Sequence, residues 1–305
     1  MADEDEHLKH RIKDTLARGL LGATLYLPYA KRVRLVGWVV SKCVAPLAGW
    51  RRRVLNNLAY VAPEMSDKEA RAVADKVCNN VGRALIEIYS GDEFIERATH
   101  SEIGGPGQDA LEQARKDGRP CVLITAHLGN YDVVRAKLSR DGFPMAALYR
   151  PMDNEGFNAH YVNAISKVAA PVYPTDKRGI TSLVRHLKDG GNIGIVADVG
   201  ATNAPLLEFY GKPAHTPLSA AEWALKYDAL LIPVFGIRKL DGLNFRVHVS
   251  DPIPHTTPEI MMQAYNDTVE GIVRTHINQW FWVHRRWKLG QAEKDTLSAD
   301  AQPPK

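Results

Sequence analysis

The spacing of apolar and polar residues predicts an α/β region from about residue 105 onward. Apolar runs typical of strands cover 120–126, 145–150, 192–198, 230–239 and 243–250. Amphipathic runs typical of helices cover 130–142, 180–190 and 218–229, and a longer one begins at Thr257 and Pro258. Strands that alternate with helices of this length indicate crossover connections between strands of one sheet. We therefore predict an α/β fold, with a mixed, largely parallel sheet flanked by helices.

A further amphipathic helix is predicted ahead of this region, over residues 66–89. Ser66 and Glu69 have the spacing of a capping box, which marks the first turn of a helix. The apolar positions that follow at helical spacing are Val73, Val77, Val81, Leu85 and Ile88. We expect this stripe to pack in the protein core and not to line a ligand groove.

The N-terminal segment combines positive charge with short apolar runs. Residues 7–53 contain eleven Lys or Arg and one acid, Asp14, and the apolar runs are 19–30 and 35–50. Neither run reaches the roughly 18 uninterrupted apolar residues that span a bilayer. Basic residues beside Tyr26, Tyr29, Trp38 and Trp50 favour a segment that lies in the interface of an anionic membrane. The alternative is an ordinary helical hairpin with a solvated basic face.

Composition limits the remaining possibilities. The 305 residues are 45% hydrophobic and 24% charged, as in a folded protein. The three cysteines form no C-x-x-C, and no Walker A or G-x-G-x-x-G sequence follows a strand, so neither a disulfide framework, a zinc site nor a nucleotide cofactor is indicated. We expect three parts: a membrane-associating segment over 1–65, an α/β catalytic domain over 66–290, and a disordered polar tail over 291–305.

Polar residues stand at the ends of several predicted strands. His127, Arg150 and Asp198 follow the first three, and Arg238 ends the fourth. Ligands of open α/β sheets bind beyond these carboxyl ends. His127 is also followed five residues later by Asp132, although eleven histidines and 35 acids predict about 1.3 such pairs by chance. The position of the pair, rather than its spacing, makes it a candidate site.

The pair His127–Asp132 suits general-base catalysis. A histidine at a strand end can take a proton from an attacking hydroxyl, while a carboxylate one turn into the next helix fixes its tautomer. Gly129 lets the backbone pass close to a substrate. No G-x-S-x-G is present, so the attacking hydroxyl is expected to belong to a substrate. We expect the pair to face solvent.

Several segments together resemble the late acyltransferases of lipid A biosynthesis. They include 126-AHLGNYD-132, 149-YRPMDN-154, 187-LKDGGNIGIVAD-198, 209-FYGKPAHTP-217, 231-LIPVFGIR-238 and 279-QWFWVHRRWK-288. The order and spacing of these segments make the resemblance specific, and it extends over nearly the whole chain. Two positions depart from the usual pattern: Asp132 stands where Glu is common, and 198-DVGA-201 lacks a second acid that often follows Asp198.

The resemblance implies transfer of a fatty acyl chain from an acyl carrier protein thioester to a hydroxyl of a lipid A precursor. It implies His127 and Asp132 as the catalytic pair, Arg150 and Asp198 as substrate-binding positions, and Gly129 and Asn130 beside the substrate. No metal, cofactor or nucleic acid is expected. It implies a location at the cytoplasmic face of a bacterial inner membrane, with peripheral or single-pass attachment.

Other interpretations stay open at this point. The acceptor could be another membrane glycolipid, such as a phosphatidylinositol mannoside. A metal-dependent phosphoesterase could use His127, Asp132, Asp198 and His284 as ligands. A non-catalytic membrane adaptor would use the basic N-terminus and keep a degenerate site. Arg285, Arg286 and Lys288 could form a basic surface that steers the acidic carrier protein. Equally, the aromatic residues among them could pack this segment into the core.

Overall fold

The computed structural model describes residues 19, 21–152, 154–201 and 203–289. The expected disordered tail over 291–305 and the first 18 residues of the expected membrane segment lie outside this part of the chain. Its helices are α2 (Tyr29–Val39), α3 (Ala45–Leu47), α4 (Trp50–Val61), α5 (Asp67–Tyr89), α6 (Asp92–Thr99), α7 (Gln108–Asp117), α8 (Asp132–Arg140), α9 (Glu155–Val168), α10 (Lys177–Lys188), α11 (Ser219–Lys226) and α12 (Pro258–Thr275), with a π-helical turn over Val40–Val44 between α2 and α3. Its strands are β1 (Glu102–Gly104), β2 (Cys121–Thr125), β3 (Met145–Tyr149), β4 (Val172–Pro174), β5 (Asn192–Val196), β6 (Leu206–Phe209), β7 (Lys212–His215), β8 (Leu230–Arg238) and β9 (Phe245–Val249).

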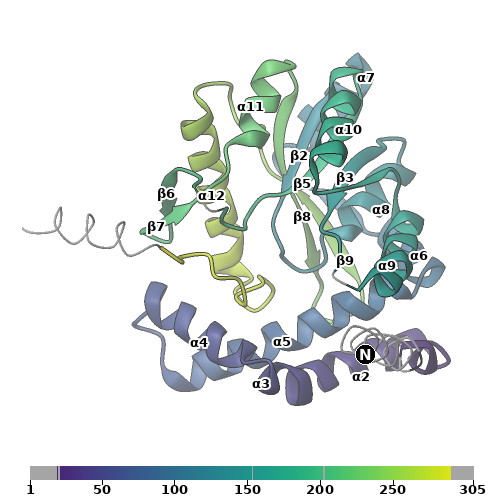
Figure 1. The fold of residues 1–305 in the computed structure, drawn as a ribbon, viewed down its shortest axis with the longest axis vertical. Coiled ribbons are helices and arrows are strands. Elements are labelled where there is room, and N and C mark those ends of the chain that lie inside the picture. The colour runs from purple at the N-terminus through teal and green to yellow at the C-terminus, as the bar shows by residue number, and fades with distance from the viewer. Residues whose placement is uncertain (1–18, 20, 153, 202, 290–305) are drawn as a thin grey trace, which may run out of the picture.

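A seven-stranded sheet in the order β1-β9-β8-β2-β5-β3-β4 forms the centre of the molecule (Figure 1). Strands β8, β2, β5, β3 and β4 are parallel to one another, and β9 pairs antiparallel with β8. A separate antiparallel hairpin consists of β6 and β7. The predicted mixed, largely parallel sheet is therefore confirmed. Each of the five predicted strands begins and ends within two residues of an observed strand.

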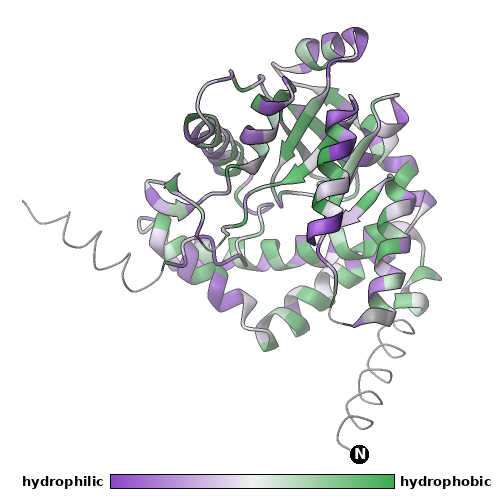
Figure 2. Ribbon diagram, turned by 45° about the horizontal axis from the view of Figure 1, so that its top comes forward, coloured by the Kyte–Doolittle hydropathy of each residue, from purple (hydrophilic) through white to green (hydrophobic). Residues whose placement is uncertain are grey.

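Helices cover both faces of the sheet, because its central strands are buried on both sides. Alternate residues of β2 point to opposite faces: Val122 and Ile124 join one hydrophobic cluster with α10, α11 and α12, while Cys121 and Leu123 join another with α6, α8 and α9. Figure 2 shows the strands of the central sheet as mostly hydrophobic and the helices as mixed. Continuous apolar runs are typical of strands with two buried faces, which is why the strands were predictable.

Helix α5 crosses the carboxyl edge of the central strands. Its first turn has the predicted capping box, with Ser66 and Glu69 bonded reciprocally. The expectation for its apolar stripe was wrong in part. Val77 and Ile88 are buried, but Leu85 is 38% exposed, and four of the five stripe residues line a groove beside His127. The stripe extends past the sheet edge, so part of it has no strand to pack against.

The N-terminal helices pack against α5 on the side away from the sheet (Figure 1). A Cβ atom at Gly82 would lie 2.7 Å from the carbonyl oxygen of Val36, so only glycine permits this approach of α2 to α5. Within the described residues, no helix is long and apolar enough to cross a membrane. Tyr26 and Trp38 are exposed, while Tyr29 is buried and Trp50 is half-buried.

Candidate functional site

The loop after β2 carries His127 to the edge of the sheet beneath α5, where a second segment of the chain holds it. The backbone N–H of Phe281 donates to the carbonyl of His127 at 2.8 Å, and the N–H of Gly129 donates to the carbonyl of Gln279 at 3.0 Å. Leu128 and Trp280 form an isolated antiparallel bridge. The position of the histidine therefore depends on a segment more than 150 residues away in sequence.

Gly129 and Asn130 shape this loop. Gly129 has φ +60°, and a Cβ atom there would lie 2.1 Å from the carbonyl oxygen of Gly236 on β8. Asn130 is buried, its side-chain amide donates to Glu87 on α5 at 2.8 Å, and its Oδ1 accepts the N–H of Asp132 at 3.1 Å. Both residues line the groove beside His127. Their contacts, however, are with the protein itself and fix the conformation of the loop.

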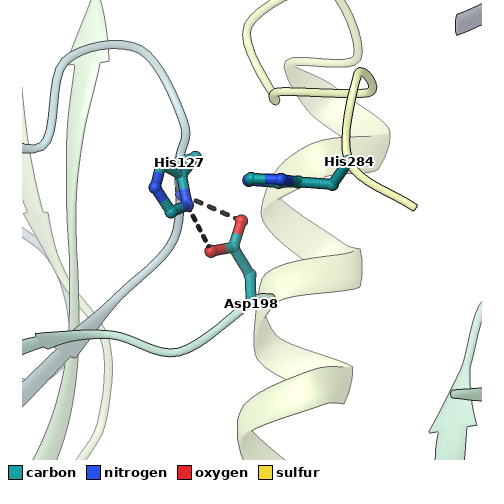
Figure 3. Close-up of side chains that lie close together, drawn as sticks. All are labelled: His127, Asp198 and His284. Carbon is teal, nitrogen blue, oxygen red and sulfur yellow. Dashed lines mark hydrogen bonds and ion pairs between the residues drawn. The ribbon is translucent and has the colours of Figure 1, made fainter. Parts of the chain in front are cut away.

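The imidazole of His127 pairs with Asp198, which follows β5 (Figure 3). Its Nδ1 lies 2.8 Å from Asp198 Oδ1, and the backbone N–H of His127 donates to Oδ2 at 2.9 Å. The indole N–H of Trp280 also donates to Oδ2, at 2.7 Å. Asp198 is 2% exposed, so three N–H groups hold a buried carboxylate in one orientation.

These contacts determine the charge of Asp198 and the tautomer of His127. Burial alone would raise the pKa of Asp198, but the charge and hydrogen bonds of His127 outweigh burial and hold that pKa well below its ordinary value. An ionised carboxylate only accepts hydrogen bonds, so Nδ1 of His127 carries the proton. The other ring nitrogen, Nε2, points away from Asp198 (Figure 3) and has a free lone pair in the neutral ring.

Asp132 occupies a different place from the one expected of it. It is 1% exposed rather than solvent-facing, and its Oδ1 accepts from Arg135 at 2.6 Å. Arg135 is also buried and donates to the carbonyl groups of Ile165 and Ala169 at the end of α9. The contact expected between Asp132 and His127 is thus made by Asp198. Asp132 sits in the first turn of α8, where its carboxylate reaches the cation three residues later.

His284 is a third titratable residue at this point. Its ring lies 4.6 Å from that of His127, centroid to centroid, with its plane turned by 73° (Figure 3). Burial lowers the pKa of His284 to about 4, so the ring is neutral at physiological pH. Its Nε2 is buried and has no hydrogen-bond partner among the described residues. A neutral ring here leaves His127 free to accept a proton without a second positive charge beside it.

The two arginines predicted at strand ends differ in role. Arg150 is exposed and lines the cavity that contains His127. Arg238 is buried and forms an ion pair with Glu87, donating from Nη2 to Oε2 at 2.7 Å. Arg150 is therefore available to a ligand, whereas Arg238 ties β8 to α5.

Two cavities meet at His127. The first, of about 540 Å³, runs between the sheet and helices α8 and α9, and we call it the sheet cavity. Its deep wall is apolar, with Leu123, Met145, Ile165 and Val234. The second, of about 280 Å³, lies along α5, and we call it the α5 groove. Both are lined by His127 and Asp132. A site with two apolar arms beside one histidine suits a reaction between two amphipathic molecules.

The metal-site alternative receives partial geometric support. One ligand atom each from His127, Asp198 and His284 lies within 4.8 Å of the others. The fourth proposed ligand, Asp132, is instead paired with Arg135. Both oxygens of Asp198 already accept N–H groups. The carboxylate of this donor set is therefore already satisfied by internal hydrogen bonds, and the side chain of Arg135 would oppose a cation at Asp132.

The aromatic residues of the C-terminal segment 279–288 pack into the core, which was one of the two alternatives for this segment. Trp280 and Trp282 are fully buried, and Arg286 is buried with hydrogen bonds to Thr216 and Asn266. Only Arg285 and Lys288 of the expected basic surface are exposed. Sequence reasoning missed the bond from Trp280 to Asp198 and considered His284 only as a metal ligand, since neither neighbourhood has a local signature.

The sequence is similar to that of known proteins over nearly its whole length. The bacterial lipid A biosynthesis acyltransferase family matches residues 3–289. A lipid A biosynthesis acyltransferase of Haemophilus influenzae is 24% identical over 271 residues, covering 85% of this chain and 83% of the relative. The lipid A biosynthesis lauroyltransferase of Escherichia coli is 22% identical, covering 90% of each chain. The lipid A biosynthesis myristoyltransferase of Escherichia coli is 21% identical, covering 76% of this chain and 73% of the relative. The chain, with its paired histidine and carboxylate where two apolar cavities meet, belongs to the bacterial lipid A biosynthesis acyltransferase family.

Proposed function

We propose that this acyltransferase moves a fatty acyl chain from an acyl carrier protein thioester to a hydroxyl of a lipid A precursor. The observation that carries the proposal is the 2.8 Å contact between His127 Nδ1 and Asp198 at the meeting point of the two cavities. We propose Asp198, rather than Asp132, as the carboxylate that supports the histidine. Asp132 instead stabilises the wall of the site, because it pairs with Arg135, which links α8 to the end of α9.

The proposed reaction has two steps at His127. Nε2 takes the proton of the acceptor hydroxyl while the hydroxyl oxygen bonds to the thioester carbonyl carbon, and Asp198 stabilises the imidazolium that forms. The tetrahedral intermediate then collapses, the carbon–sulfur bond breaks, and the leaving thiolate receives the proton from Nε2. The products are an ester and the free thiol of the carrier, and the histidine returns to its neutral state.

The two cavities suggest how the substrates are arranged. The sheet cavity has an apolar deep wall and Arg150 among its lining residues, which suits an acyl chain with a polar or anionic group near the entrance. The α5 groove is apolar along Val77, Val81 and Leu85, which suits a lipid chain. We propose that the donor chain enters the sheet cavity and that the acceptor approaches along the α5 groove.

Helices α2 and α3, with the residues just before α2, offer a surface for an anionic membrane. Tyr26 and Leu47 are 93% and 90% exposed, and Trp38 is 55% exposed. Lys31 and Arg34 are exposed on α2 among them. Apolar tips with basic neighbours are typical of interfacial attachment. We propose peripheral association with the cytoplasmic face of the inner membrane, where both substrates would be found.

A single-turnover assay tests the proposed reaction. Labelled acyl carrier protein is mixed with lipid A precursor, and ester formation is followed in the wild type and in His127→Ala. General-base catalysis contributes about 10² to 10⁴-fold, so the variant is expected to lose at least about 100-fold. His100→Ala, which changes an exposed histidine at the end of α6, is the matched control and should keep wild-type activity.

Two further outcomes separate the alternatives. Lipids from cells with and without the gene, compared by mass spectrometry, should differ by one acyl chain on lipid A; a change on another glycolipid would replace the acceptor. A metal-dependent phosphoesterase would lose activity with a chelator, whereas the proposed dyad needs no metal. A folded His127→Ala protein that retains more than a tenth of the wild-type rate would end the proposal.

A further inference from the structure

A third cavity, of about 640 Å³, lies next to the α5 groove and differs from it in charge. It lies where α5 meets the π-helical turn, the end of β8 and the segment after α12. Its lining includes five Lys or Arg side chains and a single carboxylate, from Asp75. We call it the cationic cavity. The five are Lys42, Lys76, Arg83, Arg238 and Lys239.

Among the described residues, three of these cations have carboxylate partners and two do not. Arg238 pairs with Glu87, Lys239 with Glu102 at 2.8 Å, and Lys42 with Asp75 at 2.8 Å. Within the part of the chain that the structure describes, Arg83 and Lys76 form no ion pair. Arg83 is only half-buried and Lys76 is exposed. The cavity therefore has positive charge in excess of its internal anions.

Arg83 is held in place although no described residue forms an ion pair with it. Its Nε donates to Asn79 at 2.5 Å and its Nη1 donates to the carbonyl of Gly242 at 2.9 Å. A Cβ atom at Gly37 would lie 2.9 Å from its Cγ, so α2 packs closely along its stem. Burial and the charge of Arg238 lower the pKa of Arg83. An anion bound in the cavity would offset both effects, and a fixed guanidinium suits the oxygens of a phosphate.

The cationic cavity is connected to the catalytic loop. Asn80 and Gln279 line both this cavity and the α5 groove. The side-chain amide of Asn80 donates to the carbonyl of Gly129 at 2.9 Å, two residues after His127. A molecule in the α5 groove with its hydroxyl at His127 could therefore place an anionic group in the cationic cavity without leaving the protein surface.

We propose that the cationic cavity binds a phosphate group of a substrate, with Arg83 and Lys76 as its direct contacts. The proposal rests on the acyl-transfer function proposed above. Two substrates could supply the phosphate: a phosphorylated glycolipid acceptor, or the phosphopantetheine group of the carrier protein. In either case the contact would fix the position of the substrate relative to His127, so its loss should appear mainly in KM.

The first test measures binding without catalysis. Inorganic phosphate is titrated into the wild-type protein at constant ionic strength, and the thermal midpoint is followed. Arg83→Gln and Lys76→Gln should each weaken phosphate affinity at least tenfold, which corresponds to about 1.4 kcal/mol. Lys76 is exposed, so its variant should fold normally. Arg178→Gln, which removes an exposed arginine of α10, is the control for net charge and should bind phosphate like the wild type.

The second test identifies the source of the phosphate. With an intact phosphorylated acceptor, the KM for acceptor should rise at least tenfold in both variants, while a dephosphorylated acceptor should give the same KM in variants and wild type. A rise in the KM for acyl carrier protein instead would assign the phosphate to the donor. If Arg83→Gln and Lys76→Gln match the wild type in phosphate affinity and in both KM values, the proposal is overturned. If the wild type itself transfers no acyl group, the proposed function is refuted. The phosphate titration then still decides whether the cationic cavity binds phosphate.

Discussion

Replacing Asp198 by Asn should abolish turnover while preserving the shape of the site. An asparagine has one acceptor oxygen, which can still accept the N–H of Trp280 and the backbone N–H of His127 at the Oδ2 position. Its amide NH₂ group would then face Nδ1 and donate to it, so Nδ1 must be unprotonated. The proton of the imidazole moves to Nε2, and the histidine can no longer accept the proton of the acceptor hydroxyl.

The expected loss is about 10⁴-fold in the single-turnover rate, by analogy with the wrong tautomer in serine proteases. This equals about 5.4 kcal/mol of transition-state stabilisation. Trp280→Phe removes only one of three donors to Asp198 and should lose roughly 10- to 100-fold, because one hydrogen bond to a charged group contributes about 1.5–3 kcal/mol. Asp189→Asn, at the exposed end of α10, should leave the rate unchanged.

Stability must be measured beside the rate. The pKa of Asp198 is depressed in the folded state, so its charge stabilises the protein above the unfolded pKa of about 3.9 and that contribution is lost as pH falls further. Asp198→Asn should therefore unfold at a lower temperature at neutral pH, and its rate must be taken well below that temperature. If the folded variant turns over at more than a tenth of the wild-type rate, the assignment of Asp198 as the partner of His127 is wrong.

Three other outcomes follow from the contacts. Asp132→Asn should lower the free energy of unfolding by about 3 kcal/mol or more in urea titrations, because Arg135 is left as an unpaired buried charge; the double variant with Arg135→Met should recover part of the loss, and no recovery would mean that the ion pair is not the cause. His284 has its pKa lowered to about 4, so the unfolded state binds its proton first and stability should fall as pH drops from about 6.5 to 4, by at most about 3 kcal/mol; in His284→Gln this part of the pH dependence should disappear, and an identical slope would contradict the assignment. Trp38→Asp combined with Leu47→Asp should reduce the affinity for anionic vesicles, measured by flotation, at least about 100-fold, since each exposed side chain loses apolar burial of about 1.5–3 kcal/mol. Unchanged flotation would move the membrane contact elsewhere.

Local patterns in the chain determined most of the elements. The strands were predictable because β2 and β8, at the centre of the sheet, are buried on both faces and therefore read as continuous apolar runs. The first turn of α5 was predictable because its cap is formed by two residues three positions apart. The short strands β1 and β4, of three residues each, carry too few side chains for any periodicity and were missed.

The position of His127 and of Asp198 at strand ends was also evident in the sequence, but their pairing was not. Strand register decided it: β2 pairs with β5 so that Thr125 lies opposite Val196, and the residues two positions further along each strand, His127 and Asp198, come level. Asp132 is closer in sequence, yet it lies in the first turn of α8, where its carboxylate meets Arg135. The stripe on α5 likewise became a groove wall only because the sheet ends beneath it. Contacts between residues 71 positions apart depend on how strands align and helices cross, and only the tertiary structure decides that.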